Sequence, residues 1–117
     1  MNPRTHPDAE INSNQLQKLL SRLLKQREQL ANEIETLNQQ ITRKEDCSLA
    51  DAAEAASLKE EAARATGIAA QHRQTMLEID HALMRMESGR YGVCEDSGEP
   101  IPYARLLLVP WAKSGVG

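Results

Sequence analysis

The stretch LQKLLSRLLKQREQLANEIETLNQQI, residues 16–41, decides the fold that the rest of the chain must complete. Apolar side chains recur in it at alternating intervals of four and three residues, which is the heptad pattern of helices packed side by side. The stripe consists of Leu16, Leu20, Leu23, Arg27, Leu30, Ile34, Leu37 and Ile41. The residues between them are polar, so the stretch predicts a long amphipathic helix with one buried face.

A second stripe predicts a second long helix, which ends near residue 88. Its members are Leu58, Ala62, Ala65, Ala69, His72, Met76, Ile79, Leu83 and Met86. Ser48 followed by Asp51 resembles an N-terminal cap with an acid in the first turn, and Gly89 is a C-terminal stop signal. Two such helices bury their stripes by packing antiparallel. Residues 11–88 are therefore predicted to form a long antiparallel coiled-coil hairpin with its tip near residues 42–56.

The composition agrees with a mainly α protein. Aromatic residues make up 3% of the 117 residues and Phe is absent, which argues against a thick globular core. Residues 1–10 contain two prolines and are expected to be a flexible N-terminus. The N-terminus carries no apolar run, so we expect a cytoplasmic protein without a membrane segment. The two cysteines, Cys47 and Cys94, lie in different regions and suggest no disulfide framework.

The segment 89–117 begins with GRYGVCEDSG, residues 89–98, which resembles one knuckle of a four-cysteine zinc site. Structural zinc is usually signalled by two C-x-x-C pairs, and here the first pair reads Cys94-x-x-Ser97 with no second pair after it. A small degenerate zinc-finger-like end is therefore expected, without a cofactor. Zinc would bind only if another group rescued the degenerate site.

Two carboxylates lie near the predicted tip of the hairpin. Asp51 and Glu54 are three residues apart, which places them on one face of the first turns of a helix. One interpretation is that they carry negative charge to a site that the body of the protein does not enter. The other is that acids favour a helix N-terminus because they complement the helix dipole.

The hairpin, the acidic tip and the finger together resemble the DksA/TraR family of bacterial transcription factors. The family's tip motif is D-x-x-D-x-A, and this chain has Asp51-x-x-Glu54-x-Ala56. The resemblance covers roughly residues 10–115. Positions downstream also fit the family pattern, namely Tyr91, Gly92, Cys94, Gly98, Ile101, Arg105, Leu106 and Pro110.

The resemblance implies a partner and an activity. Such proteins bind RNA polymerase, insert the coiled-coil tip through its secondary channel and alter the stability of promoter complexes, without catalysing a reaction. Asp51 and Glu54 would then be the tip acids, and Ala56 the small residue beside them. Arg105 would belong to the globular end, which in the family rests against the polymerase outside the channel.

The departures from the family pattern concern metal and nucleotide. Ser97 stands at the second cysteine position and Gly115 at the third, and a neutral serine is a poor zinc ligand beside a thiolate. We expect packing to hold the finger instead, through Val93, Ile101, Tyr103, Leu106, Leu107, Leu108 and Trp111. Glu78 and Val109 occupy positions where ppGpp-responsive members carry basic residues, which argues against a direct response to ppGpp. A redox role for Cys47 or Cys94 stays open.

Two other functions remain as alternatives. A non-catalytic coiled-coil adaptor would pair its heptads with another chain, whereas an intramolecular hairpin predicts a monomer. Direct DNA binding through the finger is disfavoured because residues 89–117 contain as many acidic as basic side chains. The target promoters, and whether the effect is activation or repression, are not encoded in any motif.

Overall fold

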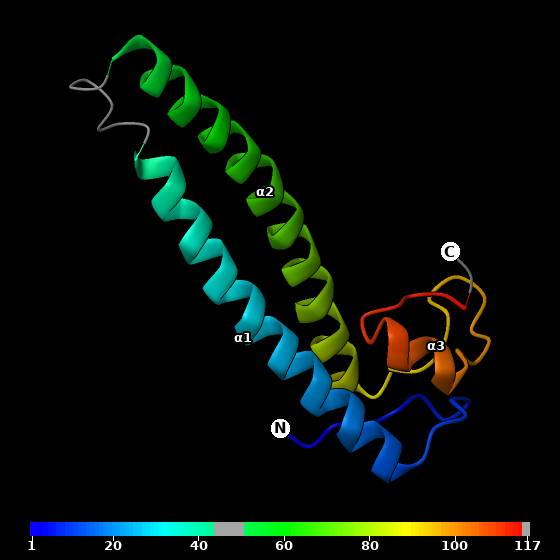
Figure 1. Ribbon diagram of the computed structural model, residues 1–117. Helices are drawn as coiled ribbons and strands as arrows, with labels where there is room; N and C mark the ends of the chain where they lie inside the picture. Colours follow the sequence, from blue (N-terminus) through cyan, green and yellow to red (C-terminus); the bar gives the residue numbers. More distant parts are fainter. Residues whose placement is uncertain (44–50, 116–117) are drawn as a thin grey trace. The chain divides into compact units, whose positions relative to one another are not determined.

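The computed structural model describes residues 1–43 and 51–115. It contains three helices, α1 (Ser13–Arg43), α2 (Ala52–Ser88) and α3 (Tyr103–Leu108), with α1 and α2 running antiparallel beside each other (Figure 1). The described residues form no strand, only the isolated bridges Thr5–Tyr91 and Val93–Pro100. The mainly α prediction with a helical hairpin is therefore confirmed.

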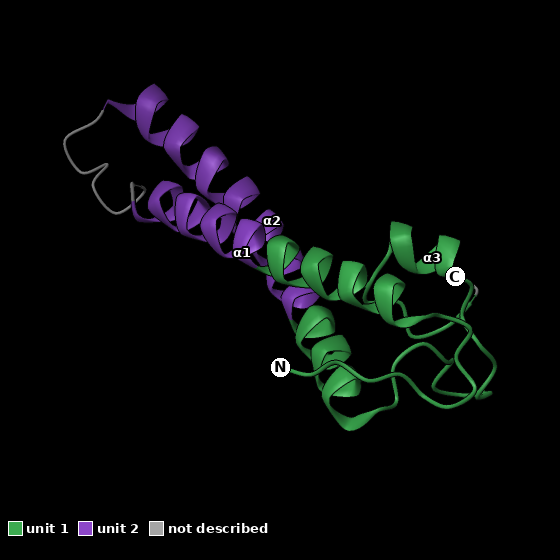
Figure 2. Cartoon of the chain, turned by 90° about the horizontal axis from the view of Figure 1, so that it is seen from below, with its two compact units in different colours: residues 1–27, 77–117 green, residues 28–76 purple. Residues whose placement is uncertain are grey.

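The chain forms two compact units, which Figure 2 distinguishes by colour. The first comprises residues 1–27 and 77–117, and the second comprises residues 28–76. The second unit is a pair of helical segments with a thin core. Leu30 of α1 is buried, as are the three alanines of the α2 stripe, Ala62, Ala65 and Ala69. Alanines allow two helix backbones to approach closely, and each alanine buries little apolar area.

Polar contacts supplement this thin core in the second unit. His72 Nε2 lies 2.9 Å from Glu33 Oε2, and Arg73 Nη2 donates to Asn38 Oδ1 at 3.1 Å. Both contacts join α1 to α2. They are partly exposed, so each contributes only a fraction of a kcal/mol to about 1 kcal/mol.

The first unit contains the main apolar core. Leucines at the start of α1 pack with the end of α2 and with the segment that follows it. The buried apolar residues are Leu16, Leu19, Leu20, Leu23, Ile79, Ala82, Met86, Tyr91, Val93, Ile101, Leu106 and Ala112. Arg27, the charged member of the first stripe, forms an ion pair with Asp80 at 2.7 Å. Arg27 can therefore occupy a position in the heptad stripe because Asp80 neutralises its charge at the edge of the core.

Both long helices begin with a side-chain cap. Asn12 Oδ1 accepts the backbone N–H of Gln15, and Gln15 Oε1 accepts the backbone N–H of Asn12, which is a reciprocal capping box. The α2 helix begins at Ala52, and Asp51 is its cap. Ser48, which the sequence pattern suggested for that role, lies outside the described residues.

Glycine ends α2 as predicted. Gly89 has φ of +73°, and Arg90 donates its backbone N–H to the carbonyl of Arg85 at 2.8 Å. This left-handed residue turns the chain out of the helix and satisfies one of the last free carbonyls.

Hydrogen bonds join the N-terminal segment, which its prolines predict to be flexible, to the rest of the first unit. The backbone N–H of Arg4 donates to Met86 O, and that of His6 donates to Tyr91 O, both at 2.8 Å. The segment passes so close to Gly92 that a Cβ there would lie 2.7 Å from the Cβ of Ala9. Residues 1–12 therefore close one side of the first unit and satisfy carbonyls at the C-terminal end of α2.

Candidate functional site

The acidic end of α2 presents three predicted site residues to solvent. Asp51, Glu54 and Ala56 are all exposed. Asp51 Oδ1 accepts the backbone N–H of Glu54 at 2.8 Å, so its carboxylate is held against the first turn of the helix. The local geometry keeps both carboxylates in the first turns of α2. Residues 44–50, which include Cys47, lie outside the described part of the chain.

The zinc-finger-like segment contains a tight turn at residues 94–99, which backbone hydrogen bonds stabilise. The N–H of Cys94 donates to Glu99 O at 2.7 Å, and the N–H of Gly98 donates to Cys94 O at 2.9 Å. Gly98 has φ of +73°, a conformation that a residue with a Cβ rarely adopts. The turn thus brings Cys94 and Ser97 together, as a metal knuckle does.

Ser97 changes the chemistry of the cysteine beside it. Hydrogen bonds from the Ser97 side chain and from the backbone of Ser97 and Asp96 lower the pKa of the Cys94 thiol, against the opposing charge of Asp96. A thiol with a lowered pKa has a larger thiolate fraction at neutral pH and reacts faster with electrophiles.

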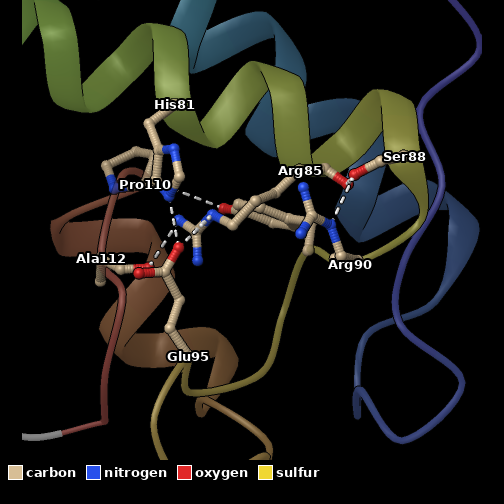
Figure 3. Close-up of polar contacts among 8 residues, drawn as sticks. His81, Arg85, Ser88, Arg90, Glu95, Pro110 and Ala112 are labelled. Carbon is tan, nitrogen blue, oxygen red and sulfur yellow. Dashed lines mark hydrogen bonds and ion pairs between the residues drawn. The ribbon is translucent and has the colours of Figure 1, made fainter.

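A polar cluster joins α2 to the finger, shown in Figure 3. His81 and Arg85 lie one turn apart on α2, and both approach Glu95, by a hydrogen bond from His81 and an ion pair of 3.7 Å from Arg85 Nε. Arg85 Nη2 also donates to Ala112 O at 3.2 Å. The guanidinium carbon lies 5.7 Å from the ring centre of Tyr91. One arginine therefore touches the helix, the knuckle and the C-terminal segment.

The electrostatics of the cluster follow from burial. Arg85 is only 2% exposed, and desolvation lowers its pKa although Glu95 opposes this. An arginine still remains charged at neutral pH. Partial desolvation raises the pKa of Glu95, but the hydrogen bond from His81 and the positive charges of Arg85, His81 and Lys113 outweigh it, so the Glu95 pKa lies below its usual value.

Further backbone and side-chain bonds close the segment after the knuckle. Tyr91 is fully buried and donates its hydroxyl to Pro110 O at 2.6 Å, and burial raises the pKa of its phenol. The N–H of Glu95 donates to Lys113 O at 3.0 Å. Both ends of the segment 89–115 are therefore held by protein groups.

The expected packing of the finger is right in part. Val93, Ile101 and Leu106 are buried, while Tyr103, Leu107 and Trp111 are half-buried. Leu108 was expected in this core, but it is 80% exposed because it lies on the outer face of the short α3. Sequence reasoning missed Tyr91 and Ala112 as core residues, and it missed the cluster around Arg85. The signal available for the cluster was His81 and Arg85 at i and i+4 on one helix face.

Several known proteins are similar to this chain in sequence or in structure. A family model described as the prokaryotic dksA/traR C4-type zinc finger matches residues 89–113. The RNA polymerase-binding transcription factor DksA of Caulobacter vibrioides is 36% identical over 107 residues, which cover 91% of this chain and 74% of that protein. The chain belongs to the DksA/TraR family. The structure of transcription factor DksA2 from Pseudomonas aeruginosa is similar, with a TM-score of 0.77 and 32% identity over 88% of this chain and 78% of that one.

Other relatives match over shorter stretches. General stress protein 16O of Bacillus subtilis is 48% identical over 44 residues, and an uncharacterized protein of Aquifex aeolicus is 51% identical over 39 residues. Each match covers 27% of the relative. The chain thus spans about a quarter of these two relatives and about three quarters of the Caulobacter protein.

The zinc site that the DksA/TraR family model implies does not fit the residues present. Cys94 supplies one thiol, and its neighbour in the turn is the hydroxyl of Ser97. Gly115, at the third position, has no side-chain donor and lies near Pro102, whose Cδ would be 3.8 Å from an added Cβ. Within residues 1–43 and 51–115, no group of three or more His, Cys, Asp or Glu side chains is arranged to hold a metal ion. A tetrahedral thiolate site needs four such ligands.

Arg105 lines one cavity together with Glu78 and Val109. The volume of this cavity is about 260 Å³. The Nε of Arg105 is buried without a hydrogen-bond partner among the described residues. The structure therefore places the predicted globular-end contact, Arg105, at the same cavity as the two positions on which the prediction about ppGpp rests. None of the described helices is both long and apolar enough to cross a membrane.

Proposed function

We propose that this chain binds bacterial RNA polymerase and regulates transcription by inserting the acidic end of its helical hairpin through the secondary channel. The observation that carries the proposal is the exposed pair Asp51 and Glu54 at the start of α2, in a chain that is similar to an RNA polymerase-binding transcription factor. No catalytic step is assigned to any residue. Cytoplasmic location and a monomeric state follow from the same proposal.

The two interpretations of the acidic pair are compatible. Asp51 uses one carboxylate oxygen to cap α2, which also suits the positive end of the helix dipole. Within residues 1–43 and 51–115, no hydrogen bond engages its second oxygen or the exposed carboxylate of Glu54, and both can meet a partner. A carboxylate fixed by its own helix loses little side-chain entropy when it meets a cation or a metal-bound centre. The cap therefore supports regulation by these acids.

The proposal assigns a second contact to Arg105 at the finger. This arginine is half-buried, so its guanidinium has a defined position from which to meet an acidic surface. We expect the finger to supply affinity and the hairpin end to supply the effect on promoter complexes. The two roles are separable by mutation.

The test is binding to purified bacterial RNA polymerase with the lifetime of open promoter complexes as the second readout. The variant Asp51→Asn/Glu54→Gln removes both charges, and asparagine keeps the helix cap. Glu28→Gln/Glu35→Gln makes the same charge change at exposed positions of α1 and serves as the control. We expect the wild type and the control to change the lifetime. The tip variant should bind with unchanged affinity but without this effect.

Two results would decide against the proposal. Absence of binding by the wild type at micromolar concentration would mean that the family's fold is kept without its partner. An equal effect of wild type and tip variant on open-complex lifetime would remove the assigned role of the acids. An adaptor would instead show a concentration-dependent dimer in analytical ultracentrifugation over at least a tenfold range, whereas the proposed regulator stays monomeric.

A further inference from the structure

A cavity of about 300 Å³ lies on the side of the finger where the N-terminal segment, the end of α2 and the knuckle meet. Three nitrogen-bearing side chains line it, His6, Arg85 and Arg90, together with Cys94 and Glu95. All these residues belong to the first unit. The cavity is separate from the hollow lined by Arg105, with which it shares no lining residue.

Arg85 is the buried polar side chain that lines this cavity. Its side chain is almost fully buried, and its Nε and Nη1 have no hydrogen-bond partner among the described residues. Only Nη2 is satisfied, by Ala112 O. Glu95 is the nearest anion, at 3.7 Å from Nε, which is too long for a hydrogen bond. Buried polar groups are almost always paired, so two unpaired donors on one guanidinium indicate a missing acceptor.

Two further donors surround the same space. The Nδ1 of His6 accepts the backbone N–H of Asp8 at 3.1 Å, so the proton of the neutral imidazole is on Nε2, which is then a donor. Arg90 uses its Nε on Ser88 and carries two further terminal nitrogens. The single carboxylate in the lining, Glu95, is already hydrogen-bonded to His81. Donors and positive charge therefore exceed acceptors and negative charge around the cavity.

We propose that this cavity binds a small oxyanion, through a phosphate or carboxylate group of a free molecule. The oxygens would accept hydrogen bonds from Arg85, Arg90 and His6, because planar guanidinium groups match the spacing of such oxygens. The bound anion would lie beside the thiol of Cys94. The site lies outside the acidic end of α2 and does not depend on binding to RNA polymerase.

Cys94 serves as the reporter in the test. The full-length protein is treated with iodoacetamide at constant ionic strength, with increasing inorganic phosphate replacing sodium chloride. Peptide mass spectrometry then gives the alkylation rate of Cys94 and of Cys47 separately, with Cys47 as the internal control. We expect phosphate to slow alkylation of Cys94 in a saturable way and to leave Cys47 unchanged. Acetate, as the second probe, distinguishes a carboxylate site from a phosphate site, and saturable protection by either supports the proposal.

Variants separate binding from folding. Arg85 is part of the core, so the tests use Arg90→Gln and His6→Gln, which change residues nearer the surface. Loss of one charge-assisted hydrogen bond should raise the phosphate concentration for half-protection about tenfold. Arg64→Gln removes the same charge from an exposed position in the other unit and should leave protection unchanged. Equal slowing of both cysteines, no protection by either probe, or unchanged protection in Arg90→Gln would overturn the proposal.

Discussion

Replacing Arg85 tests whether the finger is held by packing or by charge. Arg85→Ala removes the bond to Ala112 O, the contact with the Tyr91 ring and two methylenes of buried stem, together with a long ion pair to the partly exposed Glu95 that contributes less than about 1 kcal/mol. The orphaned buried carbonyl costs about 1–2 kcal/mol, the cation–π contact about 1 kcal/mol and the methylenes about 1.6 kcal/mol. Removing the two unpaired nitrogen donors, Nε and Nη1, offsets this loss of stability by about 2 kcal/mol. The net expectation is a loss of about 2 kcal/mol in the free energy of unfolding.

Arg85→Met keeps the apolar stem and removes the same charge. Its expected cost is within about 1 kcal/mol, because a buried charge that lacks full pairing carries its own desolvation cost. For a domain of this size, 1 kcal/mol corresponds to about 4 °C in the melting temperature. Thermal unfolding followed by circular dichroism should therefore place Arg85→Ala about 8 °C below wild type and Arg85→Met within about 4 °C. If Arg85→Met is as unstable as Arg85→Ala, the charge dominates and the packing argument is wrong.

Four further predictions follow from the same geometry. A chelator should leave the melting temperature unchanged, because the finger is held by protein groups; a clear loss of fold in a thermal scan would contradict this. The pKa of Glu95 is lowered in the folded state, so its stabilising contribution is present above the unfolded value of about 4.3 and is lost as pH falls through the folded value. The unfolding free energies of wild type and Glu95→Gln should accordingly converge in acid, and parallel pH curves would refute the assignment. Gly92→Ala should lower the free energy of unfolding by more than about 1 kcal/mol, because φ is +99° and the added Cβ would clash with a neighbour. Gly67→Ala, with open space around it, should raise it by about 1 kcal/mol. Denaturant titrations measure both. Tyr91→Phe should cost about 1–2 kcal/mol because Pro110 O loses its buried donor, and a neutral effect would show that the carbonyl finds another donor.

The helices were predictable because their signal is periodic and local. The two stripes and Gly89 predict the hairpin and the end of α2, although the first stripe omits Leu19, which is fully buried. The helix caps were harder to predict from the sequence. Asn12 and Gln15 form a reciprocal pair that the pattern contains, but a polar stretch before a helix offers several candidate caps of similar strength.

The finger was predictable as a turn and its core in part, but its polar cluster was not. The segment 101–111 is too short to show a helical repeat of apolar residues. The exposure of Leu108 could therefore not be predicted from the pattern alone. The partners of Arg85 lie 10 and 27 residues away along the chain, and pairing at such separations depends on how the segment folds back. The motif suggested Asp51 and Glu54 as candidate site acids, while the capping role of Asp51 required the structure.

The hydrogen bonds of the N-terminal segment have a consequence for the order of folding. Arg4 donates to Met86 O and to Glu87 O, and the latter contact spans 83 residues of sequence. During synthesis from the N-terminus, Arg4 and His6 therefore lack their partners Met86, Glu87 and Tyr91 until α2 and the turn after it have left the ribosome. Contacts of long sequence separation form late because the intervening loop must close first. We expect the N-terminal segment to be the last part of the first unit to gain protection from hydrogen exchange. A nascent chain stopped before residue 86 should leave this segment unprotected.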